Sequence, residues 1–113
     1  MLKVKLLRRP GPVEGERVLA GFLVEGHADF GEHGTNIVCA GVSAIAQAAL
    51  FGLQEILGGD LKSEKRGGYL EVLVDPGKAA GEGPKAILRT FELGVSAVGK
   101  SYPGTVEVRE KVL

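Results

Sequence analysis

The chain has 113 residues, with 14 basic and 14 acidic side chains and a single cysteine. This length predicts one domain over residues 1–113, built around one hydrophobic core. The balanced charge argues against direct binding of nucleic acid, because neutralising phosphates needs an excess of Lys and Arg. One cysteine excludes an internal disulfide and any structural zinc site made of several thiolates.

Residues 2–9 and residues 16–25 each alternate apolar and polar side chains, as strands do. The segment 10–15 between them is rich in Pro and Gly, which favours a turn, so these residues predict a β-hairpin. The first residues mix charges with apolar side chains and lack the apolar run of a signal peptide. We therefore expect a cytoplasmic protein.

Residues 37–57 change to a helical period, with apolar side chains near i, i+4 and i+8. Thr35 or Asn36 is a candidate N-cap, and the glycines that follow Leu57 favour an end to the helix. The run is long enough to raise the question of a membrane span. Gln47 and Glu55 interrupt it, so we interpret it as a buried helix and expect no membrane association.

The rest of the chain predicts two loops, two strands and one helix. The loops cover 61–68 and 75–83, the strands cover 69–74 and 105–110, and the helix opens at Pro84 and stops before Pro103. The element order β-β-α-β-α-β predicts an α+β two-layer sandwich, with two helices on one face of a four-stranded, mostly antiparallel sheet. The opposite face would be apolar, which predicts a homodimer. Its leucines would be Leu7, Leu19, Leu23 and Leu73.

Both histidines and the only cysteine lie around one boundary between a glycine-rich loop and the long helix, in "GHADFGEHGTNIVCAGVSAI" at residues 26–45. If Asn36 is the N-cap, Cys39 lies in the first helical turn, where free N–H groups favour a thiolate and could hold an oxyanion. His27 could face it as general base and later as acid if the loop folds back. The same residues also fit a cysteine that is a small buried hydrophobe and a histidine in an ordinary turn.

This stretch resembles the signature of the ribosomal-processing cysteine proteases, the Prp family. The family's pattern is Gly-His-Ala, a glycine-bearing loop, an acidic residue and Ile-Val-Cys-Ala-Ala-Val-Ser leading into an apolar helix. This chain matches it except at Asn36 and Gly41. The resemblance extends, by length and element order, over most of the chain. It implies a small α/β homodimer without metal or cofactor. Such an enzyme is a cysteine endopeptidase that removes the N-terminal extension of a large-subunit ribosomal protein during ribosome assembly.

Matching positions carry the family's roles onto this sequence. Cys39 would be the nucleophile and His27 its general base. Ser43 matches the family serine and would orient the nucleophile or the substrate backbone, unless its hydroxyl bonds back to the carbonyl of Cys39. The family's preference for aromatic residues near the cleaved bond calls for an apolar lining, for which Phe30 and Leu50 are candidates.

Asn36 stands where the family usually has Asp. Its amide oxygen could still accept a hydrogen bond from the histidine, but it supplies no negative charge to an imidazolium. The departure leaves open a second function, a non-catalytic ribosome-associated or peptide-binding module of the same fold. A third hypothesis is a transition-metal site, although its residues lack the paired spacing of known motifs. The ligands would be His27, His33, Cys39 and either Asp29 or Glu32.

Overall fold

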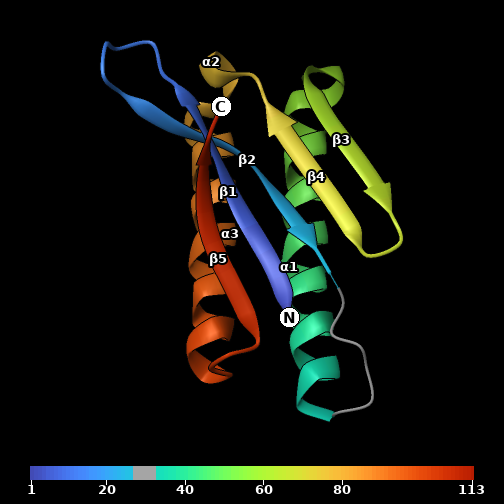
Figure 1. Ribbon diagram of the computed structural model, residues 1–113. Helices are drawn as coiled ribbons and strands as arrows, with labels where there is room; N and C mark the ends of the chain where they lie inside the picture. The colour runs from blue at the N-terminus through green and yellow to red at the C-terminus, as the bar shows by residue number, and fades with distance from the viewer. Residues whose placement is uncertain (27–32) are drawn as a thin grey trace.

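The strands of the molecule form one mixed sheet, and the helices lie against it (Figure 1). The computed structural model describes residues 1–26 and 33–113, and the side chains of residues 1–26 and 37–113. The sheet order is β3-β4-β2-β1-β5. In chain order the elements are β1 (Leu2–Pro10), β2 (Arg17–Glu25), α1 (His33–Leu57), the 3-10 turn η1 (Gly58–Asp60), β3 (Leu61–Arg66), β4 (Tyr69–Val74), α2 (Pro76–Ala79), α3 (Glu82–Ser101) and β5 (Val106–Val112).

The expected β1–β2 hairpin is present, with antiparallel pairing from Lys3 opposite Glu25 to Pro10 opposite Arg17. The α+β class is therefore confirmed, but the prediction of a four-stranded sheet with two helices is wrong. Within the described residues the sheet has five strands and the chain has three α-helices. The sheet is also mixed. β5 runs parallel to β1, whereas the pairs β1–β2, β2–β4 and β3–β4 are antiparallel.

The fifth strand, β3, occupies the segment predicted as a charged loop. Its backbone pairs with β4 from Leu61 opposite Val74 to Arg66 opposite Tyr69, yet five of its six side chains are exposed. An edge strand with no buried face carries no apolar alternation, so nothing in its side chains indicated a strand. The extra helix, α2, lies in the segment predicted as a connector, where Asp75 accepts a hydrogen bond from the Gly77 N–H at 3.0 Å.

The core lies between the sheet and the two long helices, α1 and α3, which stand side by side behind the sheet in Figure 1. The rings of Phe22 on β2 and Phe91 on α3 stack with centroids 3.9 Å apart, which joins the two layers at the centre. The α1 stripe in this core consists of Val38, Val42, Ala46, Ala49, Leu50 and Leu53. Val38, Val42, Ala49 and Leu53 belong to the face that the periodicity predicts, whereas the apolar residues Ile37 and Ile56 at the two ends of that face are exposed.

Helix α1 ends at Leu57, as predicted, and Gly58 follows with a φ of +57°, a conformation that favours glycine. Among the described residues, the segment Ile37–Asp60 is long and apolar enough, by length and composition, to cross a membrane. Of the leucines expected on the outer face, Leu7 is buried, and Leu19, Leu23 and Leu73 are half-buried.

Candidate active site

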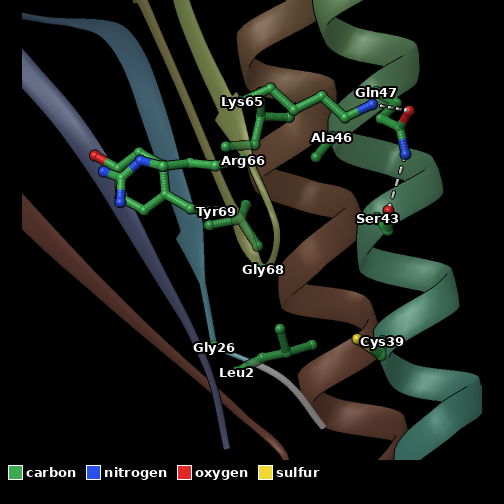
Figure 2. A pocket seen from close by; sticks show the side chains of 12 residues that line it. Leu2, Gly26, Cys39, Ser43, Ala46, Gln47, Lys65, Arg66, Gly68 and Tyr69 are labelled. Atoms are coloured by element: carbon green, nitrogen blue, oxygen red, sulfur yellow. Dashed lines mark hydrogen bonds between the residues drawn. The ribbon is translucent and has the colours of Figure 1, made fainter.

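A cleft of about 220 Å³ lies between α1 and the β3–β4 hairpin (Figure 2). One wall is a face of α1, and the other is the end of β3 with the turn and first residues of β4. Leu2 and Val24 belong to the core and also line the cleft. The full lining is Leu2, Val24, Gly26, Cys39, Ser43, Ala46, Gln47, Lys65, Arg66, Gly68, Tyr69 and Leu70.

The α1 wall presents Cys39, Ser43 and Gln47 at intervals of four residues, so they share one helical face (Figure 2). At about 1.5 Å of rise per residue, the three side chains cover about 12 Å along the helix. Cys39 is a half-buried free thiol, and its sulfur lies on the side of the helix that faces Leu2 and Gly26 (Figure 2). The predicted nucleophile is therefore accessible from the cleft rather than sealed in the core.

The start of α1 differs from the prediction. The helix begins at His33, so Thr35 and Asn36 lie inside it and neither is its N-cap. Cys39 is consequently in the second turn, and the influence of a helix N-terminus fades beyond the first turn. The apolar period begins only at Ile37, so a first turn made of polar residues and glycine gave no periodic signal. The prediction that Cys39 lies in the first turn, where free N–H groups would stabilise its thiolate, is therefore wrong.

His27 lies outside the described residues, but the residue that precedes it lines the cleft. Gly26 directly follows β2 and has a φ of +95°, and its N–H donates to the carbonyl of Gly68 in the β3–β4 turn at 3.1 Å. A Cβ at Gly26 would lie 3.0 Å from the carbonyl oxygen of Met1. The backbone of Gly26, the residue before His27, is thus held at the cleft.

Two hydrogen bonds link Ser43 to the opposite wall. The Gln47 Nε2 donates to Ser43 Oγ at 3.0 Å, and the Lys65 Nζ donates to Gln47 Oε1 at 3.2 Å (Figure 2). Among the bonds of the described residues, the Ser43 hydroxyl pairs with Gln47 and not with the carbonyl of Cys39. Sequence analysis identified Ser43 but missed Gln47 and Lys65, because Lys65 sits in a segment that was predicted as a loop.

At the β3–β4 side of the cleft, the side chains of Arg66 and Tyr69 extend away from α1 (Figure 2). The Arg66 guanidinium lies 3.9 Å from the centroid of the Tyr69 ring, and its Nε is 3.3 Å from a Glu64 oxygen. The Tyr69 hydroxyl donates to Glu71 Oε2 at 3.3 Å. Desolvation, followed by the negative charge and the hydrogen bond of Glu71, raises the pKa of Tyr69 above its ordinary value. Tyr69 therefore stays protonated at neutral pH and serves as a donor.

Several predicted site residues remain untested. The side chains of Asp29, Phe30, Glu32, His33 and Asn36 lie outside the described residues, so neither the metal hypothesis nor the role of Asn36 is tested. In the part of the chain that the structure describes, no three side chains among His, Cys, Asp and Glu gather into a metal site. Leu50 is buried in the core and does not line the cleft, so its predicted role there is wrong.

Comparison with known proteins agrees with the resemblance. The family described as "Cysteine protease Prp" matches residues 1–107. The chain belongs to this family. It is thus a cysteine protease, and its relatives include the ribosomal processing cysteine protease Prp of Staphylococcus aureus strain Mu50 / ATCC 700699. That relative is 28% identical over 106 residues, which cover 88% of this chain and 93% of the relative. Prp of S. aureus strain NCTC 8325 / PS 47 matches equally.

Solved Prp-like structures share the fold. The S. aureus Prp structure with a substrate peptide has a TM-score of 0.80 and 20% identity, covering 98% of this chain and all of that one. The same protease with a covalently linked product peptide has a TM-score of 0.79 and 22% identity, with the same coverage. SMU.848 from Streptococcus mutans has a TM-score of 0.77 and 23% identity, covering 100% of this chain and 96% of that one.

Proposed function

We propose that this Prp family member is an endopeptidase that removes the N-terminal extension of a large-subunit ribosomal protein during ribosome assembly. Cys39 is its nucleophile and His27 its general base. The observation that carries this proposal is the position of Cys39, the only cysteine of the chain, in a cleft that Gly26 also lines. A cysteine protease made from this chain has no other thiol, and Gly26 directly precedes His27.

The chemistry requires one proton carrier beside the thiol. His27 takes the Cys39 proton, and the thiolate attacks the carbonyl carbon of the scissile peptide bond. The imidazolium then returns the proton to the leaving amine, which leaves a thioester on Cys39. His27 next deprotonates a water that hydrolyses the thioester, which releases the extension and restores the thiol. Asn36 and Ser43 orient these groups, and no metal or cofactor takes part in the proposed reaction.

The shape of the cleft supports an extended peptide as the substrate. Its α1 wall covers about 12 Å from Cys39 to Gln47, which is the length of about three or four residues of extended chain. The S. aureus protease binds a substrate peptide and forms a covalent link to a product peptide in the structures of the same fold. A flexible N-terminal extension fits such a site better than a folded protein surface does.

The remaining parts of the proposal concern assembly and location. The protein would act as one domain over residues 1–113, as a homodimer in the cytoplasm, without direct contact to nucleic acid or membrane. Leu23 and Leu73 support a dimer, because they alternate with core residues along their strands and so face away from the helices. Equal numbers of basic and acidic side chains support the absence of a nucleic-acid partner. Sedimentation velocity tests the dimer directly.

The decisive experiment uses the extended ribosomal protein from the same host. The purified chain, Cys39→Ala and His27→Ala are each incubated with it, and the mass of the substrate is followed over time. Loss of the extension with the wild type alone supports the protease and both residues. A substrate that stays intact in every sample but binds the chain would overturn the proposal. Such a result would instead support the second function, a non-catalytic peptide-binding module, which the presence of Asn36 in place of the family's Asp leaves possible.

A further inference from the structure

The two hydrogen bonds of the Gln47 side chain, one to Ser43 and one from Lys65, fix the orientation of its amide. Lys65 contributes an ammonium group, which has hydrogens to donate and no lone pair to accept with. The Gln47 side-chain oxygen must therefore face Lys65, at 3.2 Å, and its NH₂ group must face Ser43, at 3.0 Å. The lysine on β3 thus decides which way round the amide on α1 lies.

The orientation of this amide decides what the Ser43 hydroxyl can do. Since Gln47 donates to it, Ser43 Oγ accepts that bond, and its own hydrogen is left for another acceptor. Among the bonds of the described residues, neither the carbonyl nor the sulfur of Cys39 takes this hydrogen. Ser43 lines the cleft one turn beyond Cys39 on the same helical face (Figure 2). Within the described part of the chain, its O–H is therefore a free donor one helical turn from Cys39.

We propose that Gln47 and Lys65 are positioning residues that set the direction of the Ser43 hydrogen bond, so that the Ser43 hydroxyl donates to a backbone carbonyl oxygen of the bound peptide. This inference rests on the proposed function, because it assumes that the cleft binds a peptide. The rise from Cys39 to Ser43 is about 6 Å, which is about two residues of extended chain. The carbonyl that Ser43 binds therefore lies within about two residues of the cleaved bond.

A pair of substitutions at Gln47 separates this role from mere bracing of the two walls. Gln47→Glu keeps the shape and gives Lys65 a stronger, charged partner, but a carboxylate cannot donate to Ser43. Ser43 would then donate its own hydrogen to that carboxylate and lose it for the peptide. Gln47→Met fills similar space and breaks both bonds, yet it leaves the Ser43 hydrogen free to turn toward the peptide.

The expected order of activity follows from hydrogen-bond direction. Gln47→Glu raises KM for a peptide of the extension sequence about tenfold with kcat within twofold, because the lost bond already forms when the peptide binds. Gln47→Met raises KM by at most about threefold. Lys65→Met, which frees the amide to turn, also gives about threefold, and Lys65→Arg restores the wild-type KM because Arg is also a donor only. Thermal unfolding of each variant confirms that the fold is intact.

The opposite order overturns the inference. If Gln47 only braces α1 against β3, Gln47→Glu retains the bridge and is at least as active as Gln47→Met. A matched control separates hydrogen bonding from charge. In a Ser43→Ala background, Gln47→Glu adds less than about twofold if it acts through Ser43. A full tenfold effect in that background assigns the loss to the added charge and also overturns the inference.

Peptide affinity keeps this test separate from the proposed protease activity. Each Gln47 substitution is repeated in a Cys39→Ala background, and the Kd of the peptide is measured by calorimetry. The same order of affinities supports the inference even if the wild type never cleaves, in which case only the proposed function fails. Equal affinities for Gln47→Glu and Gln47→Met would overturn the inference while leaving cleavage by the wild type untouched.

Discussion

The two walls of the cleft are held in place by different forces. The α1 wall carries Cys39 and Ser43 on one side of a helix whose other side is packed in the core through Val38, Val42 and Ala46. The β3 wall is an edge strand with five of its six side chains exposed, held by its backbone pairing with β4 and by the Lys65–Gln47 bond. Burial fixes the reactive group, whereas a few polar bonds place the opposite wall. The chemistry should therefore depend on α1, whereas peptide binding should also depend on Lys65 of β3, which acts on Ser43 through Gln47.

The sharpest break in this comparison is the loss of the thiol. Cys39→Ala should lower the cleavage rate by at least about 1,000-fold, because no other side chain can form the thioester. Its affinity for the extension peptide should stay within about threefold, because Ser43 and the β3–β4 wall are unchanged. Mass spectrometry of the substrate and calorimetry with the peptide give the two numbers. Cleavage within tenfold of the wild type would show that Cys39 is not the nucleophile.

A large effect on stability is expected only on the α1 side. Leu53, on the buried face of α1, is completely inaccessible, so Leu53→Ala should destabilise the fold by about 2–5 kcal/mol. Lys62→Ala on β3 removes an exposed side chain and should change the free energy of unfolding by less than about 0.5 kcal/mol. Urea unfolding of both variants measures the difference. Comparable losses at the two sites would mean that the β3 wall is as firmly built as α1.

Gly26, which follows β2 and bonds to Gly68 in the β3–β4 turn, provides an intermediate case. Gly26→Ala should cost about 1–3 kcal/mol, because its φ of +95° disfavours a side chain and the new Cβ would press on the Met1 carbonyl oxygen at 3.0 Å. Gly15→Ala is the matched control, since its φ is +81° but nothing lies within 4 Å of the added Cβ. Peptide cleavage should fall more in Gly26→Ala than in Gly15→Ala, because Gly26 directly precedes His27 and lines the cleft. Equal activity losses in the two variants would remove Gly26 from the site.

The same contrast explains what the sequence could predict. The hairpin of β1 and β2, the end of α1 at Leu57 and the strand β4 all have an apolar period or a glycine stop, and the structure confirms each of them. The motif around Cys39 identified the family, since it combines two reactive residue types at a recurring separation. Strand β3 and the true start of α1 have neither signal, because their structure depends on backbone pairing and on tertiary context.

The sequence did not predict the β3 wall of the cleft, because β3 has no apolar period. Gln47 belongs to a predicted helix. Its partner Lys65 belongs to β3, which forms a strand through its backbone pairing with β4. Their bond joins residues 18 positions apart, and no local pattern encodes such a contact. The proposed nucleophile and the proposed peptide-binding Ser43 were thus visible in a motif, whereas Lys65, which we propose to orient Ser43 through Gln47, was brought to the cleft by sheet topology.

The smallest expected effect concerns the ionisation of Tyr69 on β4. Its pKa is raised, first by desolvation and then by Glu71, so its protonated form is favoured in the folded state. A raised pKa in the folded state gives stability that is complete below the unfolded value of about 10 and is lost as the pH rises through the folded value. The loss of stability between about pH 9 and pH 11 should therefore be smaller in Tyr69→Phe than in the wild type.

The direction of this shift can be measured without interference from other chromophores. The chain has two tyrosines and no tryptophan, so Tyr102→Phe leaves Tyr69 as the only phenol that absorbs on ionisation. Its absorbance titration should have a midpoint above 10, and Glu71→Gln should lower that midpoint by removing the nearest negative charge. A midpoint below 10 would mean that the Arg66 guanidinium over the ring outweighs desolvation and Glu71. The Arg66 guanidinium would then stabilise a phenolate at Tyr69 at high pH, in place of the neutral hydroxyl that donates to Glu71.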